Sequence, residues 1–439
     1  MSPISLTFLY IFVLIAAALF TRYAAKGEGR WVAMVGALTS LTGSVTALLW
    51  AISGNNQVVS GSLWGLTASM DRFSYTVAPS VSLGAFVVVT ALPRRAAHNK
   101  ALSRALLLLA ASALGLVSGD LILVGVAESV GVLIAATSLP SVPGRRVMWL
   151  SLGLMWLGVL LSPTLALPSE AEGLPVLPLA LFLVAGGLRL GVPLLATGLL
   201  DQLGRGLCAS SVLFAAPLGG VILLARVVHP GMHAHTHGAH ALMTVMLALS
   251  LLYGLIGVTQ KNLGRALGYV LSASHMLLVV GLVEPASAVG FVGSELLWSA
   301  MLLAEVGLLL AYTLVESRVG VMSLHVRHGL NDSMPRLARL SLLLTLSVAA
   351  LPGSMDFIAV EMLLSGESTH SVGGAILMAA SLSAIAFGLV RVHFRVFFGR
   401  PTQPPSSLEG LPRELMALSL LLVALLVGGL APSVLPLLR

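Results

Sequence analysis

Five ionisable side chains lie inside long apolar stretches of this sequence. They are Glu128, Arg189, His275, Glu305 and Glu361. If these stretches cross a bilayer, each charge costs about 2.5–3.5 kcal/mol on insertion scales, so each residue requires a partner or a function. Carboxyl, guanidinium and imidazole groups at one depth can form a proton relay, because burial favours the neutral carboxyl and a nearby cation favours the charged one. We therefore take these five residues as candidate members of a proton relay.

A structural role is the alternative for four of these residues. Glu128 and Arg189 could neutralise each other and fix two helices together. His275 and Glu305 could each be packed residues with satisfied hydrogen bonds. Glu361 differs from them, because no basic residue lies near it in sequence, which favours proton binding.

The composition indicates where these residues must lie. Hydrophobic residues make up 57% of the 439 residues and charged residues 9%, and the mean hydropathy is +0.99. A soluble domain carries about 25% charged residues, because its surface must be solvated. The sequence therefore predicts an integral membrane protein and argues against a soluble enzyme or a nucleic-acid-binding domain. The single cysteine, Cys208, can form neither an internal disulfide bond nor a thiolate metal site.

Helices are expected to carry the candidate residues across the membrane. A helix that crosses about 30 Å of hydrocarbon needs roughly 20 apolar residues, and continuous apolar runs favour helices over strands. The sequence contains about fourteen such runs, at 4–21, 31–52, 74–93, 103–119, 121–140, 147–165, 174–200, 206–227, 240–259, 264–284, 290–315, 337–366, 372–394 and 412–438. We therefore predict an all-α membrane protein with about 14 transmembrane helices. The first run lacks a basic segment and a clear cleavage site, so we expect it to be retained as a span.

The basic residues predict the orientation of these spans. If the N-terminus lies outside, twenty of the 24 Lys and Arg residues fall on the cytoplasmic connections and the adjoining helix ends. Basic residues concentrate on the cytoplasmic side of membrane proteins, where they also meet anionic lipid. We therefore expect a multi-pass protein of the bacterial inner membrane with both termini on the outer side.

Two of the predicted spans contain helix-breaking residues. Arg189 is followed by Gly191 and Pro193 in the seventh span, and Pro352-Gly353 interrupts the twelfth. A proline removes a backbone donor, and such a break survives in a bilayer where protein or a hydrated cavity satisfies the freed groups. The breaks lie five spans apart, which predicts inverted five-helix repeats of spans 4–8 and 9–13. We therefore expect an N-terminal three-helix segment at 1–102, two five-helix repeats at 103–227 and 240–398, and a C-terminal helix at 399–439.

Seven short segments carry patterns typical of one superfamily. They are residues 70–74, 118–128, 223–226 (Leu-Leu-Ala-Arg), 259–276, 334–335 (Met-Pro), 350–361 and 387–401. In this order and spacing they resemble the antiporter-like subunits of respiratory complex I, a superfamily shared with multisubunit cation/proton antiporters and membrane-bound hydrogenases. The resemblance covers most of the chain and implies the same fold.

The resemblance also implies roles for individual residues. Glu128 takes the place of the family's fifth-helix glutamate, Glu361 that of the twelfth-helix ionisable residue, and Arg189 falls near the seventh-helix lysine. Several positions depart from the pattern. Leu218 holds the place of the eighth-helix lysine, Gly264 that of a lysine in the tenth span, and the arginine at 189 cannot hand on a proton as a lysine can. Glu305 and His275 complete the expected relay.

The leading functional hypothesis is a proton-translocating subunit of a complex I-like assembly, such as an NADH:quinone oxidoreductase. It implies other membrane and peripheral subunits, the lipid bilayer and protons as partners, and no cofactor in this chain, because no motif for a redox group is present. One alternative is the membrane subunit of a DAB-type inorganic-carbon accumulation complex, in which proton flow drives bicarbonate formation. Another is a degenerate, structural subunit.

We assign no chemical role to two further features of the sequence. Glu295, in the same run as Glu305, is expected at the membrane interface. Five histidines, at 229, 233, 235, 237 and 240, lie after the eighth predicted span. Their spacing is compatible with a metal site, but we interpret the segment as a polar loop without a metal.

Overall fold

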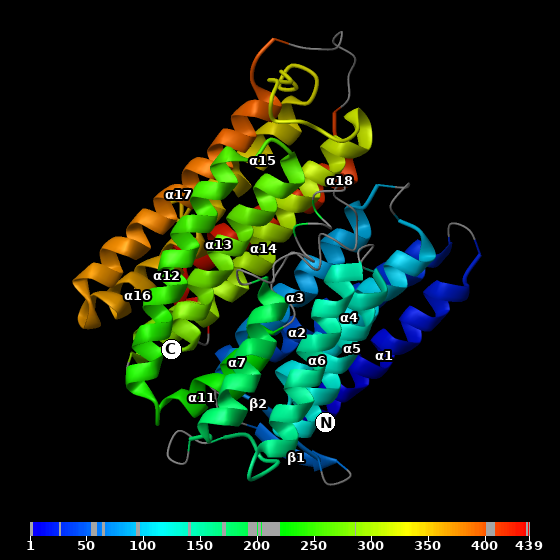
Figure 1. Cartoon of the computed structure of the whole chain (residues 1–439). Coiled ribbons are helices and arrows are strands. Elements are labelled where there is room, and N and C mark those ends of the chain that lie inside the picture. The colour runs from blue at the N-terminus through cyan, green and yellow to red at the C-terminus, as the bar shows by residue number, and fades with distance from the viewer. Residues whose placement is uncertain are drawn as a thin grey trace.

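Figure 1 shows the computed structural model of the chain. It describes residues 3–25, 28–53, 59–63, 66–93, 97–138, 142–168, 173–191, 200, 203, 220–285, 287–400, 409–435 and 438. Pro193, Asp201, Cys208 and Leu218 lie outside the described residues.

Helices make up nearly all of the described regular structure. The N-terminal half contains α1 Pro3–Tyr23, α2 Glu28–Ile52, β1 Val59–Leu63, β2 Leu66–Met70, α3 Arg72–Ala91, α4 Asn99–Leu116, α5 Leu121–Ser138, α6 Val142–Leu161 and α7 Val176–Leu190. The C-terminal half contains α10 Val221–Leu223, η1 Leu224–Val228, α11 His229–Met232, α12 Thr236–Thr259, α13 Leu263–Leu282, α14 Ala288–Val319, α15 Pro335–Val348, α16 Met355–His370, α17 Val372–Phe397, α18 Pro412–Leu430 and η2 Pro432–Val434.

These helices confirm the predicted helical membrane fold. Within the described part of the chain, nine helices are long and apolar enough to cross a membrane, and four shorter apolar helices accompany them. Many of their bounds follow the predicted apolar runs to within a few residues, but α7 and α18 end eight or more residues before their runs do, and the run 337–366 forms two helices, α15 and α16. The total of about fourteen spans and the inverted repeats stay predictions.

A β-hairpin is the one element that the all-α prediction missed. Strands β1 and β2 pair in antiparallel register from Val59 opposite Met70 to Leu63 opposite Leu66. The Ser69 amide donates to the Val117 carbonyl, which ties the hairpin to the end of α4. The hairpin lies in the connection between two predicted spans, where short alternation of apolar and small polar residues gives too weak a signal to outweigh the helical pattern. We call the end of the bundle that carries β1, β2 and the first turn of α3 the hairpin end (Figure 1).

Helix α14 forms the centre of the bundle. The apolar stretch of α14 that could cross a membrane is completely buried, whereas α12 and α18 each bury about a third of the corresponding stretch. Helices α3, α13, α15, α16 and α18 pack against it. A helix that is apolar all round is expected in such a fully enclosed position. Residues 293–315 of α14 are therefore shielded from both lipid and water.

Both predicted helix breaks coincide with the ends of described helices. Helix α7 ends at Gly191, which adopts a left-handed conformation with φ 72°. Between α15 and α16 the chain turns through Ala350 (φ 60°) and Gly353 (φ 91°). The Ser354 side chain then accepts from the Phe357 amide and caps α16. These breaks place helix ends inside the bundle, next to α13 and α14.

A close glycine contact makes the centre of the bundle sensitive to side-chain size. A Cβ atom on Gly293 of α14 would lie 3.0 Å from the Leu363 amide nitrogen of α16. We expect Gly293→Leu to lower the thermal unfolding temperature of the detergent-solubilised protein, with a cost of at least about 1–3 kcal/mol for overpacking. Gly131 on α5 is the matched control, because a Cβ atom there meets nothing within 4 Å. Equal melting temperatures for Gly293→Leu and Gly131→Leu would contradict the close packing of α14 on α16.

Candidate proton relay

Glu128 and Arg189 form a buried ion pair. Glu128 lies in the middle of α5 and Arg189 in the last turn of α7, and the Arg189 guanidinium donates to the Glu128 carboxylate. Their side chains are 5% and 2% exposed. The two charges therefore contact each other, an arrangement that fits both a relay and the structural alternative.

Helix α6 fixes the orientation of the arginine. The Arg189 Nε atom donates to the Ser151 hydroxyl at 2.7 Å, and that hydroxyl donates to the Ala185 carbonyl at 3.0 Å. Each additional hydrogen bond offsets part of the cost of burying the two charges. Contacts with α5 and α6 thus hold the side chain of Arg189, which itself lies on α7. It remains charged because a guanidinium does not deprotonate in proteins.

The end of α7 also contacts His275 on α13. The His275 Nδ1 atom lies 2.9 Å from the Leu190 carbonyl oxygen. Because a carbonyl oxygen can only accept, Nδ1 must carry a hydrogen in this contact. Leu190 directly follows Arg189, so the last turn of α7 contacts both Glu128 and His275 through neighbouring residues.

The other nitrogen of His275 faces Glu305 on α14. The Nε2–Oε2 distance is 3.1 Å, and the two side chains are 2% and 0% exposed. Since Nδ1 already holds a hydrogen, the Nε2–Oε2 contact contains one proton, which lies either on the imidazole or on the carboxyl. The pair can therefore exist as imidazolium with carboxylate or as neutral imidazole with carboxylic acid. A contact that shares one proton between two groups is the basic unit of a proton relay.

Asp356 is a buried carboxyl that the sequence analysis did not select. It lies in the first turn of α16, is 2% exposed, and accepts a 2.7 Å hydrogen bond from the Ser347 hydroxyl at the end of α15. It is also close enough to Glu305 for their charges to interact. The sequence feature that could have identified Asp356 is its position as an acidic residue in the first helical turn after the Pro352-Gly353 break.

Glu361 does not lie where the sequence analysis expected it. Its side chain is exposed on the surface of the described chain, whereas the buried face of α16 contains Asp356, Ala359 and Leu363. A residue five positions after Asp356 is rotated by about 140° around a helix with 3.6 residues per turn. Glu361 is therefore not brought together with the buried residues described above, and Asp356 occupies the interior position on α16.

Glu295 is buried inside the bundle, near the start of α14. It is 5% exposed and interacts electrostatically with Asp71 and Arg226. Sequence periodicity could not show these interactions, because both partners lie on other helices. Its depth relative to the membrane interface stays a prediction.

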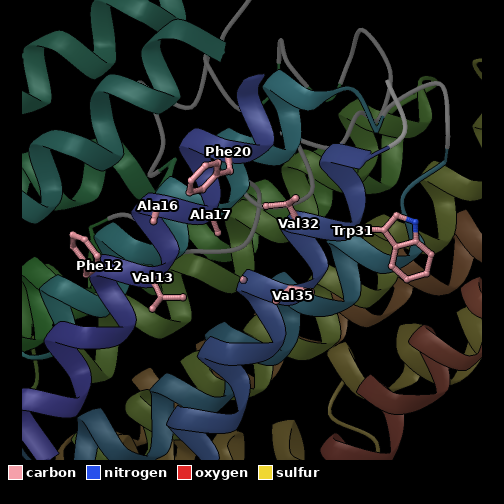
Figure 2. A pocket seen from close by; sticks show the side chains of 9 residues that line it. Phe12, Val13, Ala16, Ala17, Phe20, Trp31, Val32 and Val35 are labelled. Atoms are coloured by element: carbon pink, nitrogen blue, oxygen red, sulfur yellow. The ribbon is translucent and has the colours of Figure 1, made fainter. Parts of the chain in front are cut away.

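The histidine-rich segment and a surface groove between α1 and α2 do not add to these candidate relay residues. Within the described ranges, no group of three His, Cys, Asp or Glu side chains could hold a metal ion. Figure 2 shows a groove between α1 and α2, lined by apolar side chains that include Phe12, Phe20 and Trp31. Such a surface suits hydrocarbon and offers no group that could carry a proton.

Comparison with known proteins identifies relatives among membrane subunits of redox complexes. No family model matches the chain. It is 27% identical over 286 residues to NAD(P)H-quinone oxidoreductase chain 4 2 of Synechococcus elongatus, over 62% of this chain and 53% of the relative. It is 26% identical over 286 residues to NAD(P)H-quinone oxidoreductase chain 4 1 of Trichormus variabilis, over 62% of this chain and 54% of that one. The chain thus spans about half the length of the curated relatives that it matches.

Solved structures share the fold over nearly the whole chain. A chain of respiratory complex I from Thermus thermophilus matches with a TM-score of 0.84 and 21% identity, covering 98% of both chains. A chain of the Mrp complex from Dietzia matches with a TM-score of 0.84 and 17% identity, covering 100% of this chain and 96% of the other. A chain of an archaeal membrane-bound sulfane sulfur reductase matches with a TM-score of 0.83 and 16% identity, covering 96% and 76%. The resemblance found in the sequence motifs is therefore confirmed, and the chain is a multi-pass membrane protein with this fold.

Proposed function

We propose that this chain, which shares its fold with membrane subunits of complex I and of the Mrp complex, is a proton-translocating antiporter-like subunit of a complex I-like assembly. The observation that supports this most directly is the contact between His275 and Glu305, which holds one proton between two fully buried groups. The proposed relay is a row of residues that we call the central row: Glu128, Arg189, His275, Glu305 and Asp356. All of them except Arg189 can bind and release a proton.

Arg189 would act by its charge, because it cannot release a proton. While Glu128 is ionised, it neutralises Arg189, and a positive charge on His275 is tolerated nearby. When Glu128 takes up a proton, the charge of Arg189 is no longer balanced and repels an imidazolium on His275. His275 would then give its proton to Glu305, and from there Asp356 could receive it. Proton binding at one end of the row would thus drive proton transfer at the other.

The energy for this movement would come from partner subunits. The related chains belong to multisubunit complexes, and no recognisable redox motif lies in this sequence. We infer a location in the inner membrane of a bacterium, with both termini on the outer side, from the distribution of Lys and Arg.

The exposure of Glu361 favours the structural-subunit alternative in one respect, because it removes an expected relay residue. Asp356 supplies a buried carboxyl in its place.

Asp356 and Glu361 give a matched test of this proposal on one helix. We expect Asp356→Asn to reduce proton translocation at least about tenfold, because the amide keeps the shape and the Ser347 contact but cannot bind a proton. Glu361→Gln should leave translocation within about twofold of the parent, because its side chain lies outside the central row. Both would be measured as proton movement into sealed vesicles that contain the purified intact assembly. The reverse order of effects would return the role to Glu361 and remove Asp356 from the row.

A further inference from the structure

A second group of buried charges lies outside the central row, near the hairpin end. It consists of Asp71, Arg226 and Glu295. Asp71 caps the start of α3, Arg226 lies in the π-helical segment η1, and Glu295 lies two turns into α14. The group therefore joins the N-terminal half of the chain, through α3, to the central helix α14.

Arg226 is held in place by contacts that leave it little freedom. Its Nη2 atom donates to Asp71 Oδ1 at 3.2 Å, to the Ser74 hydroxyl at 2.7 Å and to the Leu116 carbonyl. Its guanidinium lies 5.7 Å from the centre of the Phe73 ring, which stacks on Trp298 of α14 at 5.4 Å. A fixed positive charge thus lies between two carboxyl groups.

One cation cannot neutralise both carboxyl groups, so one of them is expected to carry a proton. Asp71 is 33% exposed and accepts two hydrogen bonds from Ser74, through its amide at 2.9 Å and its hydroxyl at 2.8 Å. Glu295 is 5% exposed, so the proton is better placed on Glu295.

Glu295 and Glu305 lie on the same helix at different depths. They are ten residues apart, which corresponds to about 15 Å along α14. Ser299 lies one turn from Glu295 in the direction of Glu305. The Ser299 hydroxyl and Glu305 Oε1 are buried without a hydrogen-bond partner among the described residues, and buried polar atoms of this kind are normally satisfied by water. Both oxygen atoms lie on α14, within the stretch that runs from Glu295 to Glu305.

We propose that Glu295 is the carboxyl through which the central row exchanges protons with the hairpin end of the bundle. This inference rests on the proposed function. Glu295 first releases its proton to solvent beside Asp71, which leaves a carboxylate next to the fixed charge of Arg226. A proton from the Glu305 carboxyl then passes through water beside Ser299 and returns Glu295 to its protonated form. No bond other than those to the transferred proton forms or breaks.

The test compares Glu295→Gln with Glu367→Gln in vesicles that contain the purified intact assembly. Glu367 is the matched control, because it is also buried, at 6% exposed, but lies on α16 and interacts with Glu284 and His370. Under an imposed membrane potential, Glu295→Gln should lower proton flux at least about tenfold, whereas Glu367→Gln should stay within about twofold of the parent. Glu295→Asp should keep part of the flux that Glu295→Gln loses, because it retains a carboxyl group. A purely structural role of Glu295 would not require this difference between the two variants.

A second measurement reads the protonation of Glu295 directly. The infrared spectrum of the parent should contain a carboxylic acid C=O band that disappears in Glu295→Gln and remains in Glu367→Gln. If Glu305→Gln blocks proton flux but Glu295→Gln does not, the role of Glu295 is overturned and the proposed function stands. If the parent conducts no faster than protein-free vesicles, the proposed function and this inference both fail.

Discussion

Glu305→Gln is expected to reduce proton pumping by the intact assembly at least about hundredfold. The glutamine fills nearly the same volume in the fully buried site and can still contact His275, so the fold should persist. It cannot accept the proton that His275 releases, so the central row would be interrupted at its middle. The measurement is the initial rate of proton accumulation in sealed vesicles during turnover of the assembly.

Glu305→Asp provides the matched control for this change. It retains a carboxyl group that is one methylene shorter, so it should keep a measurable part of the pumping rate. Pumping by Glu305→Gln at the parent rate, with the protein incorporated at the parent level, would remove Glu305 from the row.

Arg189→Met is expected to affect both stability and transport. It leaves the Glu128 carboxylate buried without its cation, and breaking a buried ion pair in this way costs about 3–5 kcal/mol. The thermal unfolding temperature of the purified protein should fall accordingly. Proton translocation should also fall at least about tenfold, because the charge that links Glu128 to His275 is lost.

The double variant Glu128→Gln/Arg189→Met separates these two effects. Removing both charges eliminates the uncompensated carboxylate, so most of the stability should return. Translocation should stay low, because neither the proton-binding group nor the linking charge is present. Recovery of translocation together with stability would show that the pair only fixes α5 to α7, as in the structural alternative.

The helices could be predicted from sequence because their signal is local. Each predicted span is a continuous apolar run, and the breaks at Gly191 and Pro352-Gly353 follow from the backbone properties of those residues alone. The hairpin at 59–70 was missed because it is short and depends on pairing with the α4–α5 connection.

The candidate site could be predicted only in part, because contacts between distant helices do not follow from a local pattern. The pair of Glu128 and Arg189 was expected from the cost of unpaired charges in hydrocarbon. The contact of His275 with the Leu190 carbonyl was not, because it joins residues 85 positions apart. The family resemblance and the lack of a basic neighbour pointed to Glu361, whereas the rotation of α16 places Asp356 on the buried face.

The most direct test of the central row is proton flux through the purified intact assembly in vesicles, driven by an imposed membrane potential without turnover. The parent and Glu361→Gln should conduct protons at similar rates, well above protein-free vesicles. Glu305→Gln should conduct at least about tenfold more slowly, because the proton shared with His275 has no acceptor. Equal flux in the parent and Glu305→Gln, or parent flux no greater than that of protein-free vesicles, would contradict proton conduction along the central row.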